Sequence, residues 1–201
     1  MNIKSISTLA KKKNIVYYSL IPVFLLTVFA FAFSSISTSP SITSDSQVLG
    51  GMNYKGNVCV TQFRDGEIIS TNCDHNVAMN IGLNKTRDIL GLGASNPFNV
   101  IHLCNATAGA GCGTPAITDT AVQNTYVGCG LTAAAGTYAN ATGAGNWSIF
   151  KTFTSSCDAR LTNVTYITDS SNVPLAGAYF GNLVTLQTND QITVNWTLTI
   201  S

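Results

Sequence analysis

The chain carries six cysteines, and all of them follow a long apolar segment near the N-terminus. An apolar segment after a basic start is typical of an exported chain, and an even number of cysteines in such a chain predicts a disulfide framework. We therefore expect three disulfides and an oxidising compartment. The cysteines are Cys59, Cys73, Cys104, Cys112, Cys129 and Cys157.

A predicted hairpin suggests one pairing. Between Cys59 and Cys73, two strand-like runs flank the dipeptide Asp65-Gly66, which is a preferred dipeptide of tight hairpin turns. With Gly66 at the centre, the two cysteines stand the same number of residues from the turn and face each other across the strands. We therefore expect Cys59 to bond to Cys73.

The other four cysteines leave alternatives open. Cys104 and Cys112 bracket a loop of small residues that a disulfide could pin, which leaves Cys129 for Cys157. A metal site is the competing interpretation, because His102 and three of these cysteines are soft ligands. Zinc sites favour ligands in close pairs such as C-x-x-C, however, and the chain has none. We expect disulfides, with no metal and no other cofactor.

The N-terminal region predicts export or anchoring. Lys4 and Lys11 to Lys13 precede Ile15 to Phe33, a run of 19 residues without charge. That length spans a bilayer core as a helix, and the positive flank should remain inside the cell. A signal peptide cleaved after Ala32 gives the same pattern, although its apolar region is usually shorter. Residues 1–33 are therefore a signal peptide or a membrane anchor, and if they are an anchor the N-terminus is cytoplasmic.

Residues 34–50 are predicted to be a linker, followed by a folded domain at residues 51–201. Nine of the 13 residues from Ser34 to Ser46 are Ser or Thr, a composition that cannot bury a core. Beyond residue 33 the chain has six basic and nine acidic residues. Such a weakly charged exterior does not attract nucleic acid, so we expect no nucleic-acid partner.

Six sites match the acceptor pattern for N-glycosylation, Asn-X-Ser or Asn-X-Thr. Two of them, Asn105 and Asn140, fall in Gly/Ala-rich stretches that predict loops, and Asn195 lies on the polar face of a predicted strand. Glycans would be tolerated at such positions. The six candidates are Asn84, Asn105, Asn140, Asn146, Asn163 and Asn195.

The body of the chain predicts strands. From Ile192 to Ile200, apolar residues alternate with Thr and Asn, which is the period of a half-buried strand. Seven further runs, each bounded by Gly, Asn, Asp or Pro, have strand-like composition. They are Asn57 to Phe63, Glu67 to Thr71, Phe98 to Leu103, Thr125 to Leu131, Trp147 to Phe153, Leu161 to Ile167 and Asn182 to Leu186.

One segment, Val77 to Leu90, has helical spacing, and Gly91 is its expected C-cap. Many strands and one helix predict an all-β fold, an antiparallel sandwich or jelly roll with one short helix. The apolar helix of residues 15–33 would precede it.

The chain also contains short motifs that resemble a known group. These are Asp65-Gly66-Glu67, His75-Asn76-Val77, Asn80-Ile81-Gly82-Leu83, Arg87-Asp88-Ile89-Leu90-Gly91 and the run Gly113 to Ala121. Over roughly residues 56–130 the pattern is similar to small phage-type tail and fibre proteins and to related surface proteins of archaea. The resemblance implies a structural β-domain without catalysis. The leader and the six cysteines depart from that pattern, because tail proteins assembled in the cytosol need neither.

The sequence contains no recognisable catalytic set. His75 and His102 are the two histidines and neither lies in a known motif, and Glu67 has no partner for glycoside hydrolysis. Trp147 and Trp196 are in phase with apolar strand neighbours, which favours core packing over a sugar platform. We therefore do not expect an enzyme.

Together these observations predict an extracellular structural or adhesive protein of the cell surface. It would associate with itself or with other surface proteins, and with the membrane through residues 15–33 if these are retained. One form is a filament subunit in which the segment from Thr43 to Asn57 adds a strand to a neighbour's sheet. The alternative is a monomeric anchored module that binds glycans or proteins. An exported enzyme is the third and weakest interpretation.

Overall fold

The structure is a computed structural model that describes residues 47–49, 52–93, 95–107, 111–140 and 145–200. The predicted leader, residues 1–33, and most of the predicted linker lie outside these residues. The described part of the chain forms eleven strands and one helix.

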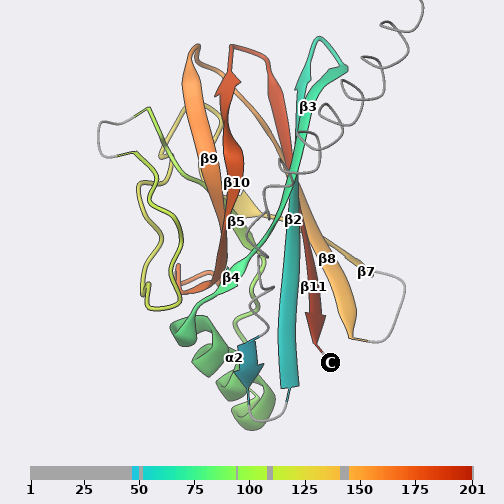
Figure 1. Ribbon diagram of the computed structural model, residues 1–201, viewed down its shortest axis with the longest axis vertical. Coiled ribbons are helices and arrows are strands. Elements are labelled where there is room, and N and C mark those ends of the chain that lie inside the picture. Colours follow the sequence, from blue (N-terminus) through green and yellow to red (C-terminus); the bar gives the residue numbers. More distant parts are fainter. Residues whose placement is uncertain (1–46, 50–51, 94, 108–110, 141–144, 201) are drawn as a thin grey trace, which may run out of the picture. The chain divides into compact units, whose positions relative to one another are not determined.

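The strands form two antiparallel sheets (Figure 1). In the six-stranded sheet the order is β1-β2-β11-β8-β7, and β3 also pairs with β2. Its members are β1 (Gln47–Leu49), β2 (Met52–Arg64), β3 (Glu67–His75), β7 (Thr137–Asn140), β8 (Asn146–Thr154) and β11 (Gln191–Ile200). In the five-stranded sheet the order is β4-β10-β9-β5-β6. Its members are β4 (Val77–Ala78), β5 (Val100–Leu103), β6 (Ala134–Ala135), β9 (Arg160–Thr168) and β10 (Pro174–Leu186).

The main core lies between the two sheets, and β11 is at its centre. This strand pairs with β2 on one side and with β8 on the other over almost its whole length. Its alternating apolar residues Ile192, Val194, Trp196 and Leu198 are all 0% exposed. The strand predicted from the alternation is confirmed, and so is the all-β class with one short helix.

The β2–β3 hairpin turns at Asp65 and Gly66, as expected. Both have positive φ, 52° and 84°, which is the conformation of a two-residue hairpin turn. A turn centred between these two residues would by itself offset the cysteines by one position. The register shifts at Ile69, however, so that Cys59 lies directly opposite Cys73. A β-bulge, rather than a turn centred on Gly66, therefore aligns the pair.

The chain passes from one sheet to the other at two places. After His75 the chain leaves β3 and continues as β4, which pairs with β10 of the five-stranded sheet. Similarly, β6 and β7 belong to different sheets and are separated by Gly136 alone. A Cβ atom at Gly136 would overlap Ile149, so only glycine fits at this corner. These crossings hold the two sheets together at their sides.

One predicted strand is wrong. Residues Thr125 to Leu131 form no strand and make only an isolated bridge between Thr125 and Cys104. Cys129 (φ 60°) and Gly130 (φ 72°) have left-handed backbone conformations that a strand cannot contain. The segment is an irregular loop, and within it the side chains of Tyr126 and Leu131 are buried.

Strand β10 is longer than its predicted part, Asn182 to Leu186. Its first residues, Pro174 to Ala178, are all buried and show no alternation. A Cβ at Gly177 would overlap Pro115 on one side, so the loop around Pro115 packs directly on the strand. Because this stretch is covered on both faces, the period of two that marks a half-buried strand is absent.

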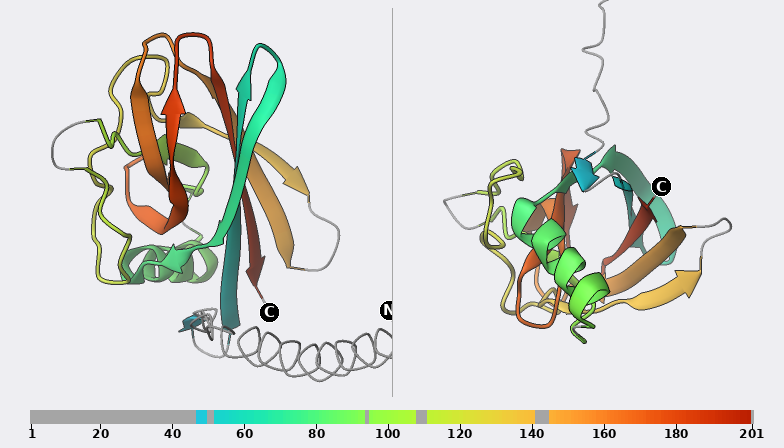
Figure 2. Two further views of the ribbon diagram at one scale, coloured as in Figure 1. Left: turned by 45° about the horizontal axis from the view of Figure 1, so that its top comes forward. Right: turned by 90° about the horizontal axis from the view of Figure 1, so that it is seen from below.

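The helix α2 (Asn80–Leu92) begins later and ends later than the predicted Val77 to Leu90. Val77 and Ala78 pair with β10, and the Met79 amide donates to the Leu175 carbonyl at 2.9 Å, so these residues belong to the sheet. The C-cap is Gly93, with φ 69°, rather than Gly91. The helix lies across one end of the two sheets (Figure 2).

Two glycines of α2 provide a matched test of how closely the helix packs. A Cβ at Gly82 would overlap the backbone of Pro174 and Leu175, whereas nothing lies near a Cβ at Gly91. We expect Gly82→Ala to lower the free energy of unfolding by about 1–3 kcal/mol. Gly91→Ala should raise it by about 0.5–1 kcal/mol, because alanine is the better helix former. Urea unfolding measures both, and equal effects would contradict the close packing.

Candidate functional site

The structure joins the six cysteines as Cys59–Cys73, Cys104–Cys112 and Cys129–Cys157. These are the three pairs that the sequence analysis favours. The first links β2 to β3, and the other two lie at the start and near the end of the long irregular segment after β5. Three disulfides in one small domain indicate folding in an oxidising, extracellular environment.

That irregular segment, residues 104–133, is here named the covering loop. Its described residues lie beside β9 on the outer side of the five-stranded sheet (Figure 1). Met79, Cys104, Val164 and Tyr166 form a second buried cluster, packed against Cys112 and other residues. The first disulfide of the loop is thus part of a small core of its own. This second core explains why β9 is buried on both faces.

Two buried carboxylates accept hydrogen bonds within turns and do not form a reactive site. Asp190 is 2% exposed, and Arg64 donates to it through Nε at 2.9 Å and Nη2 at 2.7 Å. This guanidinium holds the pKa of Asp190 below its usual range. Asp169 accepts the amides of Ser171 and Val173 in the turn between β9 and β10. Asp169 thus stabilises the connection before β10, and Asp190, which also accepts the Gln187 amide at 2.9 Å, the connection after it.

The two histidines lie apart. His75 is exposed at the end of β3, whereas His102 is 3% exposed in β5 of the other sheet. His102 lies opposite Tyr166 on the face of the sheet where the second buried cluster forms, so it is buried although it alternates with Ile101 and Leu103. Its Nε2 lies 2.9 Å from the Thr168 hydroxyl, and burial lowers the pKa of His102 to about 4. At neutral pH it is an uncharged part of the core.

An apolar cavity of about 480 Å³, here named the end pocket, lies between α2 and the ends of several strands. It is rich in aromatic and aliphatic side chains, and it reaches the surface because Leu90 and Tyr138 are each 63% exposed. Apolar lining with few polar groups is the usual character of a binding pocket of this volume. The lining residues are Tyr54, Thr86, Ile89, Leu90, Pro97, Phe98, Asn99, Tyr138, Trp147, Ile149, Leu175 and Ile200.

The end pocket could not be found from the sequence. Trp147 was expected in the core, and it does pack against the core, but it also forms part of the pocket wall. Trp196, expected there too, is fully buried. The pocket walls come from α2 and from strands of both sheets. No local pattern brings such distant segments together.

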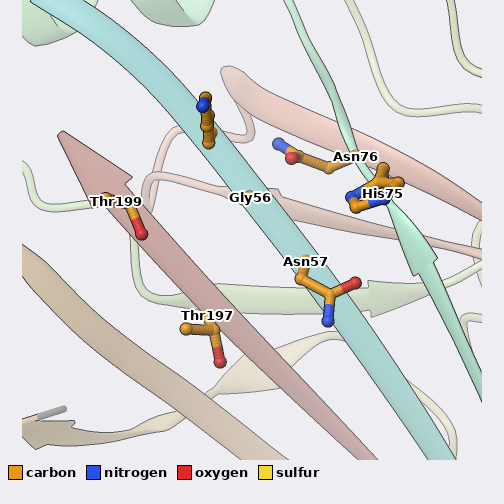
Figure 3. A pocket seen from close by; sticks show the side chains of 7 residues that line it. Gly56, Asn57, His75, Asn76, Thr197 and Thr199 are labelled. Carbon is orange, nitrogen blue, oxygen red and sulfur yellow. The ribbon is translucent and has the colours of Figure 1, made fainter. Parts of the chain in front are cut away.

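A smaller hollow of about 180 Å³, the fork pocket, lies where β3 leaves β2 (Figure 3). The Asn76 side chain packs on Gly56 at the fork, and the backbone N–H of Asn76 donates to the Gly56 carbonyl at 3.2 Å. Figure 3 shows Thr197 and Thr199 on β11, Asn57 on β2 and His75 at the end of β3. Lys55 completes the lining. The groups offer amide, hydroxyl and imidazole hydrogen bonds.

The glycosylation candidates lie in different environments. Asn84 on α2 and Asn195 on β11 are exposed, and Asn105 is half-buried. In Asn146 on β8 and Asn163 on β9, the side-chain oxygen is buried and accepts no hydrogen bond from the described residues. Asn140 is the last residue of β7 rather than part of a loop.

The described residues contain no group of three His, Cys, Asp or Glu side chains that could hold a metal ion. In the same residues, no helix is long and apolar enough to cross a membrane. The apolar run of residues 15–33 lies outside the part that the structure describes.

The sequence matches no model of a protein family, and comparisons with curated proteins and with solved structures find no significant match.

Burial of His102 predicts a specific dependence of stability on pH. Its pKa falls from an ordinary 6.5 to about 4 on folding, so between these values the unfolded chain binds a proton that the folded chain does not. Stability should therefore fall as the pH is lowered from 6.5 to 4, by on the order of 2 kcal/mol. Urea unfolding across this range should show the loss in the wild type and in His75→Gln. His102→Gln should lack it, and an unchanged loss in that variant would contradict the assignment.

Proposed function

We propose that the protein is an extracellular structural or adhesive protein of the cell surface, exported through residues 1–33 and assembled with further copies of itself. Its three disulfides support an extracellular location. The proposed role has no catalytic step, in keeping with the resemblance to tail, fibre and archaeal surface proteins. The end pocket is the observation that carries the proposal, because it offers apolar surface that a partner can bury.

The position of β1 suggests which segment of a second copy fills the end pocket. Gln47 pairs with Tyr54, and Tyr54 lines the pocket, so the chain enters the domain beside it. The preceding residues, 34–46, can extend to roughly 45 Å. They are therefore long enough to reach a neighbouring copy.

Residues 34–46 also have suitable chemistry. Ile36 and Ile42 are their only large apolar side chains, and they are an even number of residues apart. In an extended strand, both would therefore point to the same face. We propose that this segment of one copy lies along the next copy and inserts an isoleucine into its end pocket. Residues Met52 to Asn57 are not part of the donated segment, because they belong to β2 of their own chain.

A monomeric binding module is the second candidate, and the fork pocket favours it. Its amide, hydroxyl and imidazole groups suit hydrogen bonding to a sugar or to a peptide backbone. A protein that stays monomeric and binds such a ligand through Asn57 and His75 would support this function over assembly.

Assembly can be tested with full-length protein from its native cells. We expect the wild type to form regular polymers in negative-stain microscopy. The double variant Ile36→Ser, Ile42→Ser should weaken association about tenfold or more, because each buried isoleucine contributes roughly 1.5–3 kcal/mol.

Two controls separate loss of docking from loss of folding. The double variant should keep the wild-type Tm, because the strands, α2 and the buried core that the structure describes are all built from later residues. Replacing residues 34–46 by a Gly/Ser segment of equal length should weaken association at least as much. An unchanged concentration threshold for polymers in either variant, or a wild type that is always monomeric, would rule out this mode of assembly.

A further inference from the structure

The structure separates Asn195 from the other glycosylation candidates by its position on β11. Its neighbours Val194 and Trp196 are both 0% exposed, so alternation turns the Asn195 side chain to the outer face of the six-stranded sheet. The side chain is exposed there, near the middle of a strand that is paired on both sides. A group attached to it would lie on the solvent side of the sheet.

The cross-strand neighbours of Asn195 are apolar. It lies opposite Cys59 on β2 and opposite Phe150 on β8. Cys59 is bonded to Cys73, the next residue across the sheet, and the Phe150 ring is 38% exposed. Directly opposite residues on one face have Cβ atoms about 5 Å apart, so an aromatic ring and a disulfide flank the asparagine closely.

On the same face, the cross-strand neighbours of Thr193 and Thr197 differ from those of Asn195. Thr193 lies opposite Thr61 and Thr152, and its hydroxyl is 2.7 Å from that of Thr152. Thr197 lies opposite Asn57 and Ser148. The ring and the disulfide thus form an apolar strip between rows of uncharged polar side chains.

This arrangement suits a sugar ring. The faces of a pyranose carry C–H groups that pack on an aromatic ring, whereas its hydroxyls hydrogen-bond at the edges. The strip supplies the apolar contact, and the neighbouring Thr and Asn side chains supply hydrogen-bonding groups.

The other described acceptors lack this combination. The buried side-chain oxygens of Asn146 and Asn163 point away from solvent. The Asn105 side chain accepts the Thr107 amide at 3.1 Å in a local turn. Asn84 is exposed, but it lies on α2 rather than on the sheet.

We propose that Asn195 carries an N-linked glycan whose first sugar packs on Phe150 and on the Cys59–Cys73 disulfide. Asn195-Trp196-Thr197 is the acceptor. The donor is a lipid-linked sugar phosphate: the bond between the anomeric carbon and the phosphate breaks, and a bond from that carbon to Nδ2 forms. The amide loses one proton, and the lipid phosphate leaves.

The timing of this step follows from the pairing of β11. Trp196, the middle residue of the acceptor, is fully buried, and the whole acceptor is paired with β2 and β8. A transferase can bind the tripeptide only as an extended, unpaired segment. The glycan is therefore attached during export, before β11 joins the sheet, and it then settles on the outer face. The end pocket, which lies at the edge of the sandwich, remains open.

Mass spectrometry of the protein purified from its native cells tests the modification. We expect the peptide that contains Asn195 to carry a glycan, and Asn195→Gln to remove that mass. An unmodified Asn195 in the native protein would overturn the proposal.

The contact with Phe150 needs a separate measurement. Removing the glycan, by Asn195→Gln, should lower the Tm of the wild type by about 2–4 °C. The same removal in a Phe150→Ser background should leave the Tm unchanged, whereas Phe150→Tyr, which keeps the ring, should behave like the wild type. As a matched control, the effect of Asn84→Gln should be the same in all three backgrounds. An equal effect of Asn195→Gln with and without the ring would overturn the packing on Phe150.

Discussion

Burial of the alternating side chains of β11 is the interaction on which the remaining structure depends. This one strand holds β2 and β8 in the same sheet and sends four fully buried side chains into the main core. Each such side chain contributes roughly 1.5–3 kcal/mol when it is removed from water. The same alternation exposes Asn195 and the threonines of the outer face, so the strand determines both the core and the surface chemistry of its sheet.

The outer faces of the two sheets differ in what covers them. The outer face of the six-stranded sheet stays open and polar, whereas the covering loop and its two disulfides close the outer face of the five-stranded sheet. An irregular loop of this length is costly to order, and cross-links reduce that cost by restricting the unfolded chain. Pinning the loop creates the second core around Tyr166, and it leaves His102 and the start of β10 without exposed faces.

The end pocket and the fork pocket share no lining residue, whereas the fork pocket and the glycan site both lie on the outer face of the six-stranded sheet, where Thr197 belongs to both. The end pocket receives an apolar segment, the outer face of the six-stranded sheet carries a glycan, and the fork pocket offers hydrogen bonds. A low density of charge fits all three roles, because assembly and sugar packing on this surface depend on apolar contact and uncharged polar groups.

Local patterns in the sequence determined much of this protein. The period of two identified β11, and the Asp65-Gly66 dipeptide identified the hairpin and with it the Cys59–Cys73 pair. A small-residue loop indicated Cys104–Cys112, which left Cys129 for Cys157. These features depend on neighbours along the chain, so they can be recognised without the fold. Only the tertiary structure decided the bulge at Ile69, the late start of α2, the doubly covered part of β10 and the irregular path of residues 125–131. It also decided the end pocket and the pairing of Asn195 with Phe150, because these depend on which distant segments come together to cover a face or to leave it open.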